Sequence, residues 1–509
     1  MNRKFNRRDF LKLAGLLPLG LAAPRFMKDA ALSQSTGEQN VLVIVFDALS
    51  ALNISFYGYG RETTPNLARL SERAIVYHNH YSGGNYTTTG TATLLTGTLP
   101  WTSRAFRPGS VVADSVLSHN IFNAFEDYYR IAYTHNGFAN ALLKQFERYM
   151  EELVPKQKLF LNSYDSFIHT LFVNDDDIAT VGWTRTIDNE QGYSYSLFLS
   201  HLYRTLRETI IENIKQNYPR GIPSTSISVN IPFLQEHATE WLGIHLADIL
   251  QPFFGYFHFL PPHSPFRTSV EFYGRFADDG FNPPQKPLDL FAESDTNPDS
   301  LKERTEYDEF ILYADKAFGD LYTSMEESGL TENTWVVFTS DHGEMFERGI
   351  YGHRGPTLYE PVLRIPLLIF EPGRKDGMNI YTKTSAVDVL STLLHVTGHK
   401  IPDWAEGIIL PPYAPTDPDP NRKIYAMTAE KNGQYVPLTK ASTTLIMGRY
   451  KLIYCFGYPK ISRDEVLLLF DIESDHEELV DLYSSRPEIA KEMLAEMKVK
   501  LAEVDKPYL

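Results

Sequence analysis

Cysteine is almost absent from the chain: Cys455 is the only one in 509 residues. One thiol cannot form an intrachain disulfide, and it cannot supply the several thiolates of a cysteine-based zinc cluster. Basic residues are also scarce relative to acidic ones, with 48 Lys and Arg against 64 Asp and Glu and a formal net charge of −16. Because a general nucleic-acid surface needs clustered basic residues, this balance argues against nucleic acid as a partner. It leaves room for a small anionic substrate, since a single site can be locally positive.

Long hydrophobic runs are missing as well. The apolar stretch from Leu13 to Ala23 is broken by Pro18, and it is about half of the roughly 20 residues that a membrane span needs. Arg7 and Arg8 come just before it and small residues follow, a pattern typical of a twin-arginine export signal. The alternative is the basic amphipathic start of a cytosolic domain. We therefore expect residues 1–35 to be a signal and spacer. The twin-arginine translocation machinery would export the protein to the periplasm or the extracellular space, with no membrane span in the mature chain.

Hydrophobic residues are plentiful, at 43% of the chain, and they fall into two kinds of pattern. Continuous apolar runs, as at Asn40–Phe46 and Arg364–Phe370, are typical of strands buried on both faces of a parallel sheet. Between such runs the apolar residues recur at helical spacing, and Thr64 with Pro65 predicts the start of one helix with Thr64 as its N-cap. The alternation predicts a doubly wound α/β fold, a mostly parallel central sheet flanked by helices.

The last part of the chain has a different pattern. We expect a main domain over residues 36–424 and a small α+β subdomain over residues 425–509. Within the latter, Thr443–Tyr454 and Val466–Asp471 predict antiparallel strands. Ser485–Val504 predicts a final helix that is capped by Ser485.

Two of the predicted strands end in potential metal ligands. Asp47 directly follows the strand Asn40–Phe46, and Asp341 and His342 follow the strand Trp335–Ser340. In open α/β sheets, ligands gather at the carboxyl ends of the strands. Carboxylate and imidazole together suit zinc or manganese, although an acid in the position of Asp47 can instead cap the next turn.

A stretch rich in hydroxyl groups, residues 85–97, follows Ser82-Gly83-Gly84 and includes the apolar pair Leu94-Leu95. Ser and Thr at the start of a helix commonly cap its free N–H groups, and the same N–H groups attract anions. A hydroxyl here is therefore either a cap or a nucleophile that faces a phosphate or sulfate. His263 poses a similar choice, because prolines hold it at the end of a predicted strand, where a structural role and a functional one are equally compatible with the pattern.

Taken together and in order along the chain, these segments resemble the sulfatase-type branch of the alkaline phosphatase superfamily. The resemblance covers nearly the whole chain after the export signal and implies that residues 36–424 are a sulfatase-like catalytic domain. The segments that carry it are Val-Ile-Val-Phe-Asp47, Tyr57-Gly58-Tyr59, Thr63–Leu67, Leu94–Gly97 with Pro100, Pro262–Phe266, Val336–Glu344, Leu358–Glu360 through Ile365–Leu367, and Tyr450–Ile453.

The nucleophile segment departs from the family pattern. Thr87 stands where formylglycine sulfatases have Cys or Ser, and threonine cannot become the formylglycine aldehyde. The family's following Pro and Arg are Thr89 and Thr91 here, the usual Lys before Leu-Tyr-Glu is Gly355, and no second Asp follows Asp47. A Thr nucleophile is similar instead to the phosphoryl-transferring relatives, namely nucleotide phosphodiesterases, phosphoethanolamine transferases and lipoteichoic acid synthases.

The resemblance implies a metal-dependent hydrolase of phosphate or sulfate esters, with phosphoesters favoured, that works through a covalent ester on Thr87. It implies one divalent ion bound by Asp47, Thr87, Asp341 and His342. Zinc or manganese is favoured, with calcium or magnesium as the alternatives.

Further roles follow from the same resemblance. His263 and His353 are candidates to hold the anion or to protonate the leaving oxygen. Asn85 and Arg354 are candidates to bind the substrate. Two other functions stay open: a phospho-group transferase of the cell envelope, and a catalytically degenerate protein that binds an anionic ester without turnover.

Overall fold

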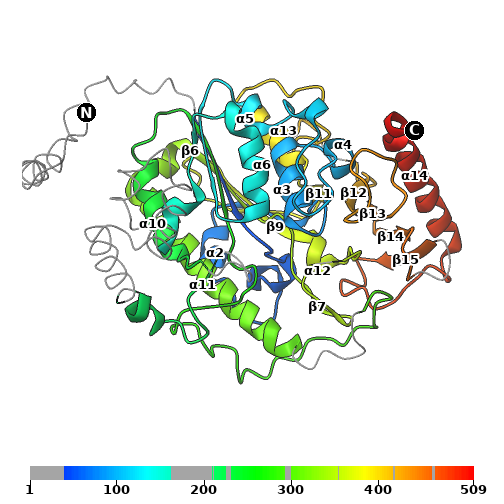
Figure 1. Ribbon diagram of the computed structural model, residues 1–509, viewed down its shortest axis with the longest axis horizontal. Helices are drawn as coiled ribbons and strands as arrows, with labels where there is room; N and C mark the ends of the chain where they lie inside the picture. The colour runs from blue at the N-terminus through cyan, green and yellow to red at the C-terminus, as the bar shows by residue number, and fades with distance from the viewer. Residues whose placement is uncertain are drawn as a thin grey trace, which may run out of the picture. The chain divides into compact units, whose positions relative to one another are not determined.

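A computed structural model describes residues 39–161, 209, 211–224, 231–292, 300–353, 355–416, 419–460 and 465–509. The predicted export signal at residues 1–35 lies outside the described residues, and so does Arg354. Within the described part, the centre of the fold is a nine-stranded sheet in the order β10-β2-β9-β6-β1-β5-β3-β4, with β11 paired to β2 (Figure 1). The strands are β1 (Asn40–Phe46), β2 (Ile75–Tyr81), β3 (Tyr129–Thr134), β4 (Glu152–Leu153), β5 (Phe253–Phe259), β6 (Thr334–Thr339), β9 (Arg364–Phe370), β10 (Met378–Ile380) and β11 (Thr384–Ser385).

The middle of the sheet is parallel. β1 pairs in parallel with β5 and β6, and β5 pairs in parallel with β3. β9 alone among these central strands runs antiparallel to its described neighbours, β6 and β2. The mostly parallel sheet expected from the continuous apolar runs is therefore confirmed, and every residue of β1 is buried, as a strand covered on both faces must be.

Alternate residues of β1 enter two different cores. Leu42, Ile44 and Phe46 pack with side chains of α2 (Pro65–Ser71), α10 (Gln235–Leu246) and α11 (Ser300–Glu327). Val41, Val43 and Val45 pack on the opposite face with side chains of α3 (Thr87–Thr96), α6 (Gly137–Phe146) and α13 (Asp388–Val396). Figure 1 shows these two helical layers with the sheet between them, which is the doubly wound arrangement that the alternating pattern predicts.

The start of α2 differs from the sequence-based expectation. Thr64 does occupy the N-cap position, but its side chain makes no capping hydrogen bond; its hydroxyl bonds to that of Ser55 at 2.8 Å. The free N–H groups of Asn66 and Leu67 donate instead to the carboxylate of Asp315, each at 2.8 Å. A residue of α11, some 250 positions away, therefore provides the capping expected of Thr64.

The C-terminal part forms a second sheet with the antiparallel order β12-β13-β14-β15. Its strands are β12 (Ile424–Thr428), β13 (Ala441–Met447), β14 (Tyr450–Phe456) and β15 (Glu465–Asp471). The predicted segment Thr443–Tyr454 is thus the hairpin of β13 and β14. The helix α14 (Pro487–Asp505) packs on this sheet through Met493 and Met497.

The start of α14 is a second correction. The helix begins at Pro487, Arg486 occupies the N-cap position, and the side chain of Arg486 makes no capping hydrogen bond. The hydroxyl of Ser485 donates to the carbonyl of Leu482 at 3.2 Å, so it is engaged outside the helix.

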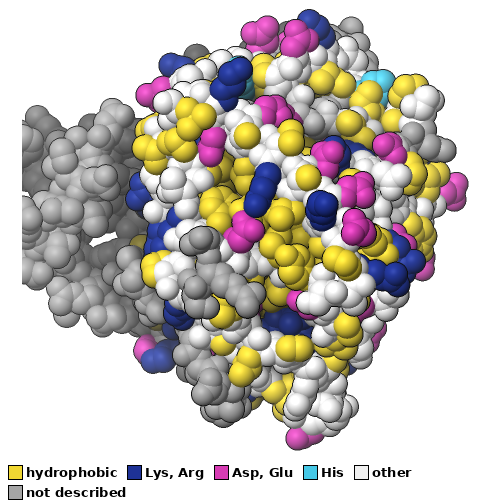
Figure 2. All heavy atoms as spheres, turned by 90° about the vertical axis from the view of Figure 1, so that its right-hand side faces the viewer, with side chains coloured by type: hydrophobic (Ala, Val, Ile, Leu, Met, Phe, Trp, Pro, Cys, Tyr) yellow, Lys and Arg dark blue, Asp and Glu magenta, His cyan; other side chains and the backbone are white. Residues whose placement is uncertain are grey.

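On the face of the molecule that carries α14, the acidic and basic side chains of the described residues are interspersed (Figure 2).

A buried ionic cluster connects the second sheet to the main domain. Lys451 of β14 lies 2.9 Å from a carboxylate oxygen of Glu360, at the start of α12 (Glu360–Leu363), and 2.9 Å from one of Glu478. All three side chains are buried. A charge removed from water in this way is tolerated only when it is paired. The cluster therefore fixes the position of the second sheet against the main domain. Within the described residues, no helix is both long enough and apolar enough to cross a membrane.

Candidate active site at the carboxyl ends of the central strands

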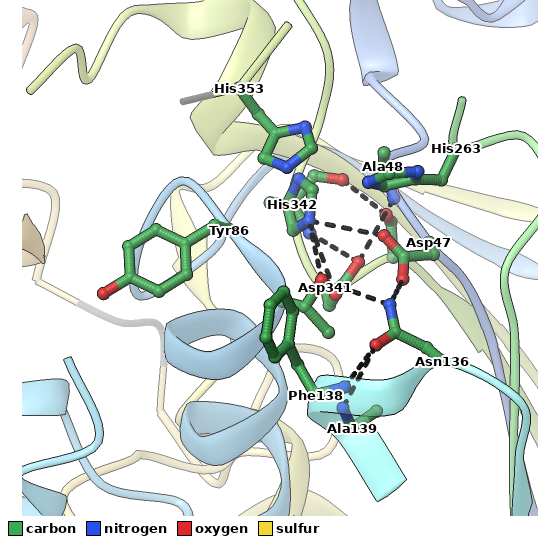
Figure 3. A network of polar contacts seen from close by, with 12 residues as sticks. Asp47, Ala48, Tyr86, Asn136, Phe138, Ala139, His263, Asp341, His342 and His353 are labelled. Carbon is green, nitrogen blue, oxygen red and sulfur yellow. Dashed lines mark hydrogen bonds and ion pairs between the residues drawn. The ribbon is translucent and has the colours of Figure 1, made fainter. Parts of the chain in front are cut away.

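The parallel centre of the sheet brings four polar side chains to one edge. Asp47 follows β1, Asp341 and His342 follow β6, and Asn136 follows β3. Since parallel strands have their carboxyl ends at the same edge, these residues meet there although they are up to 295 positions apart in the sequence. All four are buried. Figure 3 shows them converging, with the rings of His263 and His353 close by.

The two carboxylates and one imidazole form a pocket suited to a cation. Nε2 of His342 lies 3.3 Å from Oδ1 of Asp47 and 3.6 Å from Oδ2 of Asp341. Nδ1 of His342 donates to the carbonyl of Gly343 at 2.9 Å, which leaves the Nε2 lone pair directed at the carboxylates. Oδ1 of Asp47 and Oδ2 of Asp341 are buried and have no hydrogen-bond partner among the described residues.

These unpartnered oxygens fit a divalent metal ion. A buried carboxylate oxygen without a hydrogen bond is costly, and Asp, Asp and His offer the oxygen and nitrogen donors that divalent ions take. One ligand atom from each of the three residues lies within 4.8 Å of the others. The residues present therefore fit the divalent metal ion that the family pattern implies.

The electrostatics of the pocket point the same way. Burial by itself would raise the pKa of Asp47, yet nearby imidazoles, His263 first among them, hold that pKa well below its ordinary value. Burial and the charge of Asp47 raise the pKa of Asp341. Burial disfavours the imidazolium of His342, but the two carboxylates more than offset this and raise its pKa to about 9. The pocket thus draws in positive charge, which a bound cation would supply in place of protons.

Thr87 is the first residue of α3, and its hydroxyl faces this pocket. Oγ1 of Thr87 lies 3.4 Å from Nε2 of His342 and accepts a hydrogen bond from Nδ2 of Asn136 at 3.3 Å. Tyr86 occupies the N-cap position, and its side chain makes no capping hydrogen bond. Thr87 already lies inside the helix, so its hydroxyl is not the cap that a Thr-rich helix start suggests.

Three other threonines of α3 behave differently. The hydroxyls of Thr89, Thr93 and Thr96 donate to backbone carbonyls three or four residues earlier, at 2.7–2.8 Å. These bonds satisfy the hydroxyls within the helix itself. Among the four, Thr87 is therefore the one whose hydroxyl is presented to the carboxylate cluster.

His263 and His353 lie beside the pocket (Figure 3) and are half-buried, unlike the fully buried His342. Their ring centroids are 5.0 Å apart, and the ring of His353 is 4.3 Å from that of His342. Nδ1 of His263 donates to the carbonyl of Ser264 at 2.7 Å, and Nδ1 of His353 lies 3.1 Å from Oε1 of Glu344. Both rings are held by their Nδ1 atoms, so the Nε2 atoms are the ones suited to meet a substrate.

The structure gives Asn85 a definite set of contacts. Its Nδ2 donates to the carbonyls of His353, Gly355 and Thr357, at 2.9–3.0 Å. Asn85 therefore fastens the loop that carries His353 to the segment that leads into α3, while its Oδ1 has no partner among the described residues. A direct role in substrate binding stays a prediction for Asn85, and for Arg354, which lies outside the described residues.

Two residues of the site were missed by sequence reasoning. Asn136 donates through Nδ2 to Oδ2 of Asp47 and to Thr87, while its Oδ1 caps α6 by accepting from the N–H groups of Phe138 and Ala139. His258, inside β5, has its Nε2 at 3.3 Å from Oδ2 of Asp47. The signals available were the Asn-Gly pair after a strand and an ionisable residue within an otherwise aromatic run.

Two family models match the chain. The model described as Sulfatase matches residues 39–399, and the model described as N-sulphoglucosamine sulphohydrolase, C-terminal, matches residues 346–507. The chain belongs to the sulfatase family. The resemblance to the sulfatase-type branch of the alkaline phosphatase superfamily, inferred from the ordered motifs, is thereby confirmed. The protein is an ester hydrolase of the sulfatase superfamily.

Relatives and solved structures agree with this assignment. Choline-sulfatase of Rhizobium meliloti (strain 1021) is 24% identical over 472 residues, which covers 88% of this chain and 83% of the relative. Arylsulfatase K of Xenopus laevis is 29% identical over 293 residues, which covers 50% of this chain and 53% of the relative. The crystal structure of the phosphonate monoester hydrolase of Agrobacterium radiobacter has a TM-score of 0.64 at 18% identity and covers 92% of the sulfatase-family chain and 96% of its own. That last likeness shows the fold.

Proposed function

We propose that this sulfatase-family protein hydrolyses phosphate or sulfate esters, with phosphoesters preferred, by attack of the Thr87 hydroxyl beside one divalent metal ion. The observation that carries the proposal is the position of Thr87 Oγ1, 3.4 Å from Nε2 of His342 and 3.3 Å from Nδ2 of Asn136. The same Nε2 of His342 lies 3.3 Å from Oδ1 of Asp47 and 3.6 Å from Oδ2 of Asp341, two carboxylate oxygens that have no hydrogen-bond partner among the described residues. Asp47, Thr87, Asp341 and His342 would hold the ion.

A divalent ion at these residues would supply positive charge that favours the Thr87 alkoxide and neutralises the ester oxygens. The amide of Asn136 orients the Thr87 oxygen through its N–H donor. The backbone N–H groups at the start of α3 add a fixed positive potential for the anion, as helix N-termini do.

The chemistry proceeds in two steps. The Thr87 hydroxyl gives up its proton to solvent, and the bond from its Oγ1 to phosphorus forms as the bond from phosphorus to the leaving oxygen breaks; His263 or His353 donates a proton to that oxygen. The same histidine, now neutral, takes a proton from water as the water attacks the phosphorus of the Thr87 ester. The bond from Oγ1 to phosphorus breaks, the threonine takes its proton back from solvent, and the phosphate product leaves. An alcohol in place of water would make the same site a transferase.

The preference for phosphorus over sulfur follows from the residue at position 87. Threonine carries one hydroxyl on its β-carbon, so its ester cannot be discharged by forming a carbonyl at that carbon, and the second step has to be attack of water on phosphorus or sulfur. Phosphoryl groups are transferred to oxygen nucleophiles with positioning and electrostatic stabilisation alone. This is the kind of help that the amide of Asn136, the imidazoles and the helix N-terminus offer.

The test is a paired assay of the purified protein and its Thr87→Ala variant. Bound metal is quantified first, and aryl phosphate monoester, phosphodiester, phosphonate monoester and sulfate monoester are then compared as substrates. We expect phosphoester turnover that is lost in Thr87→Ala and kept in Thr96→Ala, since the Thr96 hydroxyl bonds within α3 at its far end. Sulfate turnover that survives Thr87→Ala would contradict the proposal. Metal uptake without any hydrolysis would favour the transferase, and no metal uptake would favour the binding-only alternative.

We also propose that residues 1–35 direct twin-arginine export. The twin arginines Arg7 and Arg8 and the short apolar run behind them support this. Replacing both arginines by lysine should retain the protein in the cytoplasm, as measured by cell fractionation, whereas unchanged export would contradict the proposal.

A further inference from the structure

His258 lies directly beneath the two carboxylates of the pocket. In the sheet, His258 is opposite Val45 of β1 and Thr134 of β3, and Val45 is opposite Thr339 of β6. Residues opposite one another in a parallel sheet point to the same face, and so do residues two positions further along each strand. Asp47, Asn136 and Asp341 are each two positions beyond these partners. The register therefore places the imidazole of His258 on the same face of the sheet as these three side chains, one step earlier along the strands.

The contacts of His258 agree with this placement. Its Nε2 is 3.3 Å from Oδ2 of Asp47 and 3.7 Å from Oδ2 of Asp341. The side chain is entirely buried, with 0% of its surface exposed. Within the described residues, the ion pairs with these two carboxylates are all formed by histidines. The positive charge that balances Asp47 and Asp341 therefore has to come from the imidazoles or from a cation bound between them.

The other nitrogen of His258 has a partner that fixes the ring. Nδ1 lies 3.2 Å from the hydroxyl of Tyr256. The phenol oxygen can accept a hydrogen bond from Nδ1–H. That tautomer leaves the Nε2 lone pair directed at the carboxylates, which is the arrangement of a metal-binding histidine with an outer hydrogen-bond partner.

We propose that His258 is a further ligand of the divalent ion, through Nε2, in addition to the residues of the proposed function on which this inference rests. The donor set is then two carboxylates, two imidazoles and the Thr87 hydroxyl. Imidazole suits zinc, manganese and the other transition ions, whereas calcium and magnesium take oxygen ligands. His258 therefore selects the metal: it makes the site a transition-metal site instead of a calcium site.

The alternative is that His258 only donates a hydrogen bond to Asp47 and holds that carboxylate in place. The two roles predict different metal preferences. A nitrogen ligand strengthens the binding of each ion according to that ion's affinity for nitrogen. Loss of the ligand therefore lowers the affinity of the site for zinc and leaves its affinity for calcium nearly unchanged. A residue that positions Asp47 affects both ions alike, because both use that carboxylate.

The experiment compares the wild-type protein with His258→Gln, whose amide can still donate to Asp47 but which lacks the imidazole. Metal-free protein is titrated with Zn²⁺ and with Ca²⁺ in competition with chelators, and Cu²⁺-loaded protein is examined by electron spin echo envelope modulation, which counts bound imidazoles. The matched control is His135→Gln, a second buried histidine of this region whose Nε2 accepts from the N–H of Leu260 at 3.3 Å and so does not serve as a ligand.

We expect modulation from two imidazoles in the wild type and in His135→Gln, and from one in His258→Gln. We expect zinc affinity to fall roughly 100-fold or more in His258→Gln, while calcium affinity changes less than about tenfold; retained calcium binding also shows that the variant is folded. A one-imidazole signal in the wild type, or equal losses of affinity for the two ions in His258→Gln, would overturn the proposed ligand role of His258 and leave the proposed function standing. A wild-type protein that takes up neither ion would overturn the metal dependence of the proposed function and this inference with it.

Discussion

Gly90 of α3 lies against the backbone carbonyl of Asp341, so closely that a Cβ atom on residue 90 would be 2.0 Å from that oxygen. The absence of a side chain at this point lets α3 rest on the end of β6. Thr87 is three positions earlier on the same helix, so the contact sets the height of its hydroxyl above the carboxylates. A residue with no chemistry of its own thereby positions the candidate nucleophile.

We predict that Gly90→Ala moves α3 away from β6 and lowers both stability and activity. Overpacking of this kind costs about 1–3 kcal/mol of the free energy of unfolding, and displacement of Thr87 by a few tenths of an ångström should lower kcat/KM about tenfold or more. Denaturant unfolding and ester hydrolysis measure the two effects. Gly137→Ala is the control, because a Cβ there meets nothing within 4 Å. Full activity in Gly90→Ala would show that the contact does not position Thr87.

Asn136 offers a way to separate its two hydrogen-bonding roles. Its Oδ1 caps α6, and its Nδ2 bonds to Asp47 and Thr87. Asn136→Ser keeps a good capping oxygen but removes the amide donor, so we expect kcat/KM to fall roughly 100-fold or more with little loss of stability. Asn136→Ala should lose about 1 kcal/mol of stability in addition. Thermal unfolding and kinetics distinguish the two variants.

The opposite pattern would contradict this assignment. If Asn136→Ser were as active as the wild type, the amide would not serve the reaction. If Asn136→Ser and Asn136→Ala were equally destabilised, the capping bonds would not contribute to the fold.

The sequence predicts residues whose role depends on their own strand and misses those whose role depends on a neighbouring strand. Asp47, Asp341 and His342 follow apolar runs directly, so the rule that ligands gather at strand ends is enough to place them at one edge of the sheet. His258 stands out in the sequence as an ionisable residue in a largely aromatic run, but its partner Asp47 follows only from the register of β5 with β1. Nothing in the local sequence says which acid lies opposite an imidazole within a strand.

Helix capping shows the same limit. Thr64 has the right residue type and position for a cap, and the start of α2 is where the pattern expects it, at Pro65. The capping oxygens nevertheless come from Asp315 of α11, because a carboxylate brought in by tertiary packing accepts from two N–H groups at once. The start of the helix along the chain was predictable, and the distant residue that caps it was not.

The buried Lys451 cluster gives a prediction about stability. Lys451→Met leaves Glu360 and Glu478 without their shared cation in a buried setting. Removing one partner of a buried ion pair costs about 3–5 kcal/mol, so we expect a loss of that size in denaturant unfolding. The control is Lys498→Met, which breaks a solvent-exposed pair with Glu465 and should cost less than about 1 kcal/mol.

A triple variant tests the reason for that loss. If the unpaired carboxylates cause it, Lys451→Met combined with Glu360→Gln and Glu478→Gln should recover much of the stability. Failure to recover any would mean that the packing of the Lys451 stem, and not its charge, joins the two parts.

The stability of the protein should depend on pH through His80, which is fully buried on β2. Nδ1 of His80 lies 2.9 Å from the hydroxyl of Thr384, and Nε2 has no hydrogen-bond partner among the described residues. Burial, helped by the charge of Arg422, lowers the pKa of His80 to about 3. In the unfolded chain the same imidazole has a pKa of about 6.5.

The sign of the effect follows from proton binding. Between about pH 6.5 and pH 3 the unfolded chain binds a proton at His80 that the folded protein does not, so stability falls as the pH falls through this window. The loss from this residue is roughly 2 kcal/mol at pH 5. We expect His80→Gln, which cannot take up that proton, to flatten the pH dependence of the free energy of unfolding between pH 7 and pH 5 by this amount, whatever its stability at pH 8. The same substitution at His395, which is exposed at the end of α13, is the control. An unchanged slope in His80→Gln would mean that the folded protein admits a proton at His80, and that the buried imidazole is less isolated from water than its surroundings indicate.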